Sequence, residues 1–391
     1  MTLQIDRIES PDSEVFDREY VRPSRPVIIR GALDAATCRA ATWTPDYLAS
    51  AAGDKPVEVA VSKSGCFTYH PNGAAYEMRE MILSRALELM RSPDTDLKYY
   101  VMQRSLHLYF PELVADISVP KLVDTADLAV VNLWLGSAGN VTPLHYDHSN
   151  NLLFQSYGKK VILIYPPEQT DYLYPLPSSS RFAFVSELDL LRPDPERFPL
   201  FAKADPVEAL LEPGDTLFLP AFWWHHVHSV ELSISINYWW NSYPSQLLVP
   251  NLLRCVPYVF GHNRLANLPI KGGLIALAEH AFYEARTYWL AALCGVAAFE
   301  QHVRSLLRMH SVDDRALPGR LEGLYSRLIA VAERPVPKLD ASKFENWTRL
   351  ATGARAADDR RLRPEDVAGM ISDVRQFINS APVERQLRLL D

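Results

Sequence analysis

The stretch between Lys98 and Trp240 constrains the fold more than any other part of the chain. It repeats short runs rich in β-branched and aromatic residues, and turns that contain proline and glycine separate them. The runs are Tyr99–Gln103, Ala129–Leu135, Val161–Tyr165, Thr216–Leu219 and Ser233–Trp239. Many short strands joined by turns bury their apolar faces by closing one sheet or by packing two sheets together. The sequence therefore predicts a mainly β core, either a barrel or a double-sheet jelly roll, within residues 96–245.

Residues 1–95 mix short helices with short strands. The segment Pro26–Gly31 predicts a buried strand that ends in a turn, and the alternating residues of Val57–Ser62 predict a half-exposed strand. The segment Trp43–Ala52 predicts a helix, with Thr44 as its N-cap and Pro45 as its first helical residue. We expect these N-terminal α/β elements to pack on the barrel.

Residues 246–391 have a helical pattern instead. The segments Lys271–His310, Leu321–Ala332 and Pro364–Ser380 predict amphipathic helices. The last of these begins at a proline that acidic residues follow, which complements the helix dipole. The C-terminal region is therefore expected to be a helical module. It could cap the barrel or form a dimerisation surface, and the pattern fits both arrangements.

Charge and cysteine content narrow the class of protein. A net charge of -7 lacks the positive charge expected of a general nucleic-acid binder, so nucleic acid is not an expected partner. The four cysteines Cys38, Cys66, Cys255 and Cys294 are scattered and form no CxxC pair, which fits a reducing cytoplasm. No signal peptide is evident, and charged residues interrupt the most apolar stretch, Leu274–Gly295. We expect a soluble, cytoplasmic protein without a membrane span.

Two short segments carry candidate metal ligands. His145 and Asp147 form an H-x-D pair beside a predicted strand, where residues two apart point to the same face. A third ligand, His225, follows the predicted strand Thr216–Leu219 and a turn. Two histidines and a carboxylate leave open positions that suit iron(II) with a bidentate cosubstrate and dioxygen. Zinc hydrolases can use similar ligands but usually need one open site and a general base, and each histidine alone could also be a core residue.

The neighbours of these candidates have different expected roles. Strand alternation turns His226 away from a pocket that receives His225, so we expect His226 and His228 to lie behind the centre or at its rim. The aromatic residues Trp134 and Tyr146 are expected to pack in the barrel.

Several motifs between Pro26 and Tyr243 occur together in one known enzyme family. They are Asn132-Leu-Trp134-Leu-Gly136, Thr142-Pro-Leu-His145-Tyr-Asp147, Asn151, Gly158-Lys-Lys160, Tyr165-Pro-Pro167, Leu173-Tyr-Pro175, Glu196-Arg-Phe-Pro199, Pro213-Gly-Asp215, Trp223-Trp-His225 and Asn237-Tyr-Trp239. In these motifs the chain resembles the JmjC or cupin-8 oxygenases, and among them the asparaginyl hydroxylase that acts on the hypoxia-inducible transcription factor. The resemblance implies a double-stranded β-helix core and a requirement for Fe(II), 2-oxoglutarate and O2.

The resemblance also implies how the cosubstrate is held. Lys160 would bind the distal carboxylate of 2-oxoglutarate, with help from the hydroxyls of Thr142 and Tyr100. Burying such an anion requires a paired cation and hydrogen bonds, because desolvation would otherwise be too costly. Lys159 is the alternative cation, and its position after Gly158 suggests an exposed turn residue instead.

Two amides and one indole complete the expected pocket. Asn151 and Asn237 correspond to amides that contact the cosubstrate near the metal, and Asn237 shares its strand face with Ser233 and Ser235. Trp239 either lies beside the metal or packs in the barrel core, and both interpretations remain open.

The implied activity is hydroxylation of a C–H bond, with succinate and CO2 as coproducts. We expect a protein or peptide side chain as substrate, but not asparagine, because Phe184-Val185 replaces the family's Arg-Gln pair that holds the target asparagine. A small molecule, a tRNA base or an N-methyl group could be oxidised instead, and a non-catalytic cupin that binds a ligand is a further alternative. By analogy with relatives, the C-terminal helices are expected to form a homodimer.

Overall fold

A computed structural model describes residues 3–68, 76–177, 180, 182–247, 273–283, 288–309, 325–326, 330, 339–354 and 362–380. The chain forms two compact units, Met1–Tyr258 and Val259–Asp391, and each is described by itself. The finer division into residues 1–95, 96–245 and 246–391 stays a prediction. Within the described ranges, no helix is both long and apolar enough to cross a membrane.

The strands of the first unit form two sheets. In the nine-stranded sheet the strands are, in spatial order, β2 (Arg7–Glu9), β3 (Val27–Arg30), β12 (Asp215–Leu219), β9 (Asn150–Tyr157), β14 (Ser233–Trp240), β7 (Leu128–Gly136), β6 (Lys98–Ser105), β4 (Pro56–Ser62) and β5 (Glu77–Ile82). In the five-stranded sheet they are β1 (Leu3–Gln4), β11 (Val207–Leu211), β10 (Lys160–Tyr165), β13 (Trp224–Ser229) and β8 (Val141–Tyr146). All five strand runs predicted between Lys98 and Trp240 are confirmed.

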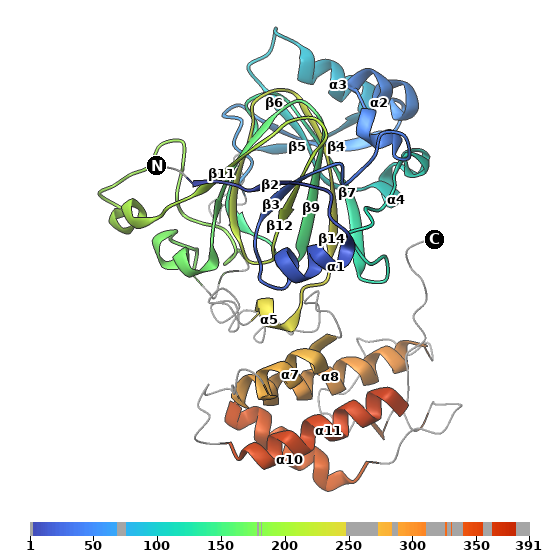
Figure 1. Ribbon diagram of the computed structural model, residues 1–391, viewed down its shortest axis with the longest axis vertical. Coiled ribbons are helices and arrows are strands. Elements are labelled where there is room, and N and C mark those ends of the chain that lie inside the picture. The colour runs from blue at the N-terminus through green and yellow to red at the C-terminus, as the bar shows by residue number, and fades with distance from the viewer. Residues whose placement is uncertain are drawn as a thin grey trace. The chain divides into compact units, whose positions relative to one another are not determined.

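The strands β7 to β14 follow the path of a jelly roll. Strands β7, β9, β12 and β14 lie in the larger sheet, and β8, β10, β11 and β13 lie in the smaller one. Figure 1 shows the strands gathered into one barrel. One apolar cluster joins the two sheets, with Ile162, Ile164, Ala209 and Leu211 from one and Ile28, Leu153, Leu217 and Leu219 from the other. The predicted double-stranded β-helix core is therefore confirmed.

Short helices cover the other face of the larger sheet. They are α1 (Ser13–Phe16), α2 (Pro45–Ala52), α3 (Leu83–Arg91) and α4 (Leu106–Tyr109), and α5 (Pro244–Leu247) follows β14. Leu48 of α2 and Leu87 of α3 share a buried cluster with strand residues such as Ile236. As predicted, Thr44 caps α2, because its side chain accepts a hydrogen bond from the Tyr47 N–H at 3.1 Å. The N-terminal elements thus extend and cover the barrel wall.

One strand prediction needs correction. Strand β4 was expected to be half exposed, but its residues from Val59 to Ser62 are all buried. The face that should meet solvent carries Ala60, which packs with Phe67 and Tyr100 in a small aromatic cluster. A chain segment that returns over that face has covered it, which alternation alone does not reveal.

The second unit is helical, as predicted. Its helices are α7 (Gly273–Tyr283), α8 (Tyr288–Met309), α10 (Ala341–Ala354) and α11 (Pro364–Ser380). The bounds of α11 agree with the prediction, whereas almost all of the predicted helix Leu321–Ala332 lies outside the described residues. Helix α8 contacts the other three, and the Phe299 ring lies 4.9 Å from that of Trp347 and 5.0 Å from that of Phe377. Helix α8 therefore contributes to the core of its own unit, and the homodimer stays a prediction.

Candidate metal centre

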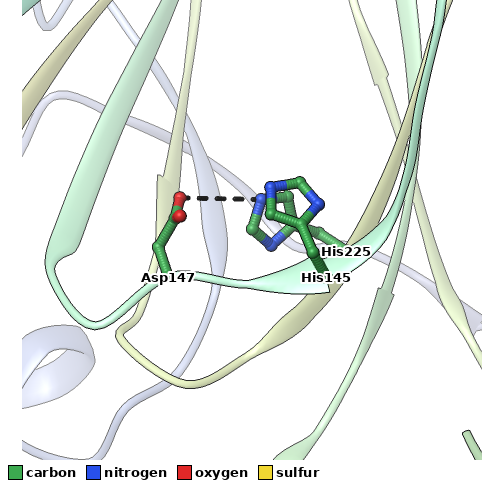
Figure 2. A group of neighbouring side chains, drawn as sticks. All are labelled: His145, Asp147 and His225. Carbon is green, nitrogen blue, oxygen red and sulfur yellow. Dashed lines mark ion pairs between the residues drawn. The ribbon is translucent and has the colours of Figure 1, made fainter. Parts of the chain in front are cut away.

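Three predicted ligands meet at the end of the smaller sheet. His145 lies on β8, Asp147 directly follows that strand, and His225 lies opposite His145 on β13. Their potential ligand atoms all lie within 4.8 Å of one another, and His225 Nε2 is 3.8 Å from Asp147 Oδ2. Figure 2 shows the carboxylate directed at the two rings. The backbone also ties the two strand ends together, because the Phe222 N–H donates to the Asp147 carbonyl at 2.8 Å.

Backbone carbonyls fix both imidazole rings. Nδ1 of His145 lies 2.7 Å from the Pro143 oxygen, and Nδ1 of His225 lies 3.0 Å from the Trp223 oxygen. A carbonyl oxygen can only accept, so each Nδ1 carries the hydrogen and each Nε2 keeps its lone pair. Both Nε2 atoms are therefore available to a metal, in the tautomer that metal-binding histidines usually adopt.

The electrostatics of the cluster favour a cation between the side chains. Burial lowers the pKa of His225 well below its usual value, and the neighbouring His145 lowers it further. Burial raises the pKa of Asp147, which His145 partly offsets. No lysine or arginine within the described residues forms an ion pair with Asp147, whose side chain is only 24% exposed. A buried carboxylate without a paired cation, beside two imidazoles whose Nε2 atoms are available, suits a divalent metal, and this ligand set fits iron(II).

A narrow cavity beside the cluster contains every site residue predicted from the sequence. These residues are Tyr100, Thr142, His145, Asp147, Asn151, Lys160, His225, Asn237 and Trp239. Lys160 extends from β10 and is 2% exposed, and burial lowers its pKa to about 7. No ion pair to Lys160 occurs in the part of the chain that is described. A buried cation without a counter-ion is unfavourable, so this cavity is suited to an anionic ligand.

Unpaired polar atoms also mark the cavity. The side-chain oxygens of Asn151 and Asn237 and the indole N–H of Trp239 are buried without a hydrogen-bond partner in the described structure. Buried polar groups are costly unless a protein group, a water or a ligand satisfies them. The residues therefore fit a small polar ligand such as 2-oxoglutarate. On the other face of β14, Ile234 and Ile236 pack in the helix-covered core, as alternation predicts.

The alternatives weighed from the sequence lie elsewhere. Lys159 is exposed on the turn after Gly158 and forms an ion pair with Glu212 at 2.8 Å. His226 is 5% exposed, and neither His226 nor His228 lines the cavity. Strand alternation therefore separates each residue of the cavity from its neighbour in the chain.

A wider pocket of about 280 Å³ opens beside two of the ligands, His145 and Asp147. It is lined by Phe67, Thr68, Met102, Gln103, Trp134, Thr142, Pro143, His145, Asp147, Phe182, Phe184, Val185 and Trp239. Trp134, expected only to pack, lines both this pocket and the narrow cavity, and so does Trp239. The register of the folded sheet explains the position of Trp134, because it pairs with Ser235 on the same sheet as Asn237. No sequence signal indicated Phe67, Met102 or Phe182.

Comparison with known proteins agrees with this geometry. The model of the cupin-like domain family matches residues 12–246, more than half of the chain. The chain is 32% identical over 241 residues to lysine-specific demethylase 8 of Xenopus tropicalis, covering 61% of this chain and 53% of the relative. It is 34% identical over 233 residues to lysine-specific demethylase JMJ30 of Arabidopsis thaliana, covering 59% and 53%. It is 30% identical over 258 residues to tRNA wybutosine-synthesizing protein 5 of Gallus gallus, covering 62% and 79%. The chain spans about half the length of the two demethylases that it matches.

Proposed function

Since the chain belongs to the cupin-like family (cupin-8), with JmjC proteins among its relatives, we propose that it is an Fe(II)- and 2-oxoglutarate-dependent dioxygenase. We further propose that it hydroxylates a C–H bond of a protein or peptide side chain. Fe(II), 2-oxoglutarate and O2 are the cofactors of the JmjC enzymes.

One observation carries the proposal. A cluster of two histidines and one carboxylate lies in the same cavity as Lys160, a buried cation without a protein counter-ion. Such a cluster alone also fits a zinc site, and a buried lysine alone could be structural. Together they provide a place for a metal and a place for an oxoacid that binds beside it. This pairing supports an oxygenase over a metallohydrolase.

Different residues of the cavity would bind the metal and the cosubstrate. His145, Asp147 and His225 would hold the iron. Lys160, with Thr142 and Tyr100, would hold the distal carboxylate of the cosubstrate. When bound, the iron supplies dioxygen activation, coupled to the conversion of 2-oxoglutarate to succinate and CO2. The protein fixes both groups in a place that aromatic side chains shield from water.

The substrate part of the proposal rests on charge and on the pocket wall. The name of one relative, tRNA wybutosine-synthesizing protein 5, indicates that it acts on tRNA. The net charge of -7 argues against a tRNA substrate for this chain. Phe184 and Val185 line the wider pocket and offer no side-chain hydrogen bond to a target asparagine. A side chain other than asparagine is therefore proposed.

The compartment and assembly remain part of the proposal. Cys38, Cys66 and Cys294 are free thiols, which suits a reducing cytoplasm.

A homodimer through the C-terminal helices would appear as twice the chain mass in light scattering of the purified protein.

The deciding experiment measures succinate formation by the purified full chain with Fe(II), ascorbate and 2-oxoglutarate under air. The variants His145→Ala and Asp147→Ala are run beside it, with and without peptide, RNA and metabolite fractions. Turnover that both variants lose would support the dioxygenase, and the fraction that stimulates it would identify the substrate class. If the native chain binds neither iron nor 2-oxoglutarate, it is a cupin that binds some other ligand.

A further inference from the structure

The wider pocket beside the metal centre indicates the chemistry of the group that is oxidised. Resting on the proposed function, we infer that this group is a neutral, apolar side chain and not a cationic ammonium or guanidinium. The inference depends on what lines the pocket and on how the nearby charges are paired.

Apolar side chains dominate the lining. Phe67, Met102 and Trp134 form one part of the wall, and Phe182 and Phe184 form another, with ring centroids 6.2 Å apart. The first part belongs to the cluster around Phe67, which extends under the wall. Such surfaces gain most from contact with an apolar or aromatic group, because both surfaces leave water.

The pocket offers almost no negative charge. Among the lining residues that the structure describes, Asp147 is the only carboxylate, and its charge would be taken up by the metal. Glu187 and Asp189, which follow Val185 in the chain, form ion pairs with Arg197 at 2.8 Å and with Arg192 at 3.5 Å. Arg104, which follows Gln103, forms an ion pair with Glu58 at 2.8 Å.

The loaded centre would add no attraction for a cation. The charges of Fe(II), the Asp147 carboxylate, the two carboxylates of 2-oxoglutarate and the Lys160 ammonium cancel. A cationic side chain would therefore lose its hydration and gain only contacts with ring faces. A neutral side chain of the same shape makes the same van der Waals contacts, forgoes the cation–π attraction and avoids that desolvation cost.

Size and rim chemistry fit a side chain presented on a peptide. The volume of about 280 Å³ lies near the lower limit of small-molecule pockets, which range from roughly 300 to 1,000 Å³. At the rim, Gln103 is exposed and has a backbone φ of +48°, and it lies within an irregularity of the pairing between β6 and β7. Its amide and the hydroxyl of Thr68 can hydrogen-bond peptide groups.

A matched pair of peptides isolates the effect of charge. One carries trimethyl-lysine in a glycine- and alanine-rich sequence, and the other carries the analogue in which carbon replaces the charged nitrogen. Both are titrated calorimetrically into the full chain with Fe(II) and 2-oxoglutarate without oxygen. We expect the neutral peptide to bind at least about tenfold more tightly, because it avoids the desolvation of a cation.

A pocket variant tests the same idea from the side of the protein. Met102→Glu adds a carboxylate to the wall, and Met102→Gln is the neutral control of nearly the same size. The Met102→Glu protein should prefer the cationic peptide, whereas the Met102→Gln protein should keep the native preference. Tighter binding of the cationic peptide to the native chain, or no binding of the neutral one, would overturn the inference.

Binding of 2-oxoglutarate alone separates the two levels of the proposal. If the native chain binds Fe(II) and 2-oxoglutarate but prefers the cation, only the substrate inference fails. If it binds neither, the dioxygenase proposal fails and the substrate inference with it.

Discussion

His145 and His225 lie directly opposite each other in the pairing of β8 and β13, with ring centroids 4.1 Å apart. The pairing shifts register between His225 and Val227, so the two histidines pair just before the irregularity. Each ring donates through Nδ1 to a carbonyl two residues earlier in its own chain segment. The geometry of the centre is therefore set by the backbone of two strands, and a ligand position cannot move by one residue without leaving the cavity.

The adjacent histidines His225 and His226 provide a matched test of the centre. Both are 5% exposed, but only His225 lines the cavity. We expect His225→Ala to lose more Fe(II) affinity than the roughly 10–100-fold that loss of an outer partner of a ligand costs. The His226→Ala protein should keep its affinity within that range. Anaerobic titration with Fe(II), followed by calorimetry, measures both values.

Equal loss of Fe(II) binding in these two variants would contradict the assignment of His225. Circular dichroism of both proteins is the control for folding, because each substitution removes a buried ring of the same size.

Lys160 and Lys159 form a second matched pair. Lys160→Met should abolish stabilisation by 2-oxoglutarate. At about pH 6, where most of the Lys160 side chain is protonated, it should also raise the free energy of unfolding of the ligand-free protein by about 1–4 kcal/mol, since a buried charge is removed. Lys159→Met removes an exposed ion pair with Glu212, which water and salt screen, and should leave the free energy of unfolding almost unchanged. Thermal unfolding with and without 2-oxoglutarate gives both quantities. A Lys160→Met protein that 2-oxoglutarate still stabilises would exclude the proposed role of Lys160.

Much of this fold was predictable because local patterns and tertiary packing agree. The period-two runs of the barrel, the Thr44 cap and helix α11 all behave as their sequences predict. The exposure of β4 was not predictable, because the chain folds back after the strand and the segment around Phe67 covers Ala60. Such a covering segment leaves no periodic signal in the strand that it covers.

The inner cavity was predictable for a different reason. Side chains alternate between the two faces of a strand, and the polar residues of the cavity occur at positions that share the inner face. Most of these residues also belong to a recognisable motif. The wider pocket was not predictable, because Phe67, Met102 and Phe182 come from three separate segments. Apolar residues that form a pocket wall have the same sequence pattern as residues that form a core. The signal from Trp134 lay in its register with Ser235, which only the folded sheet reveals.

Binding of 2-oxoglutarate should depend on pH through Lys160. Burial lowers the pKa of Lys160 from 10.5 to about 7, so above pH 7 the empty pocket holds mainly the neutral amine. The bound dianion favours the ammonium, so binding at pH 8 should take up close to one proton, and affinity should fall as pH rises above 7. Calorimetry in buffers of different ionisation enthalpy measures this uptake. It should vanish in Lys160→Arg, whose guanidinium stays charged, and its absence in the native chain at pH 8 would show a charged Lys160.

Two turn glycines should respond differently to the same substitution. Gly158 has a φ of +69°, and an added Cβ would lie 2.1 Å from the Leu232 oxygen, whereas Gly214 has a φ of +94° and open space around that position. Gly214→Ala should therefore lower the free energy of unfolding by only about 1–2 kcal/mol, the cost of the left-handed conformation for alanine. Gly158→Ala should cost clearly more, because the backbone must also move, and the turn that it distorts leads directly into Lys160. Urea unfolding measures both costs, and the Gly158→Ala protein should also bind 2-oxoglutarate more weakly. Equal costs in the two variants would mean that the contact with Leu232 relaxes freely.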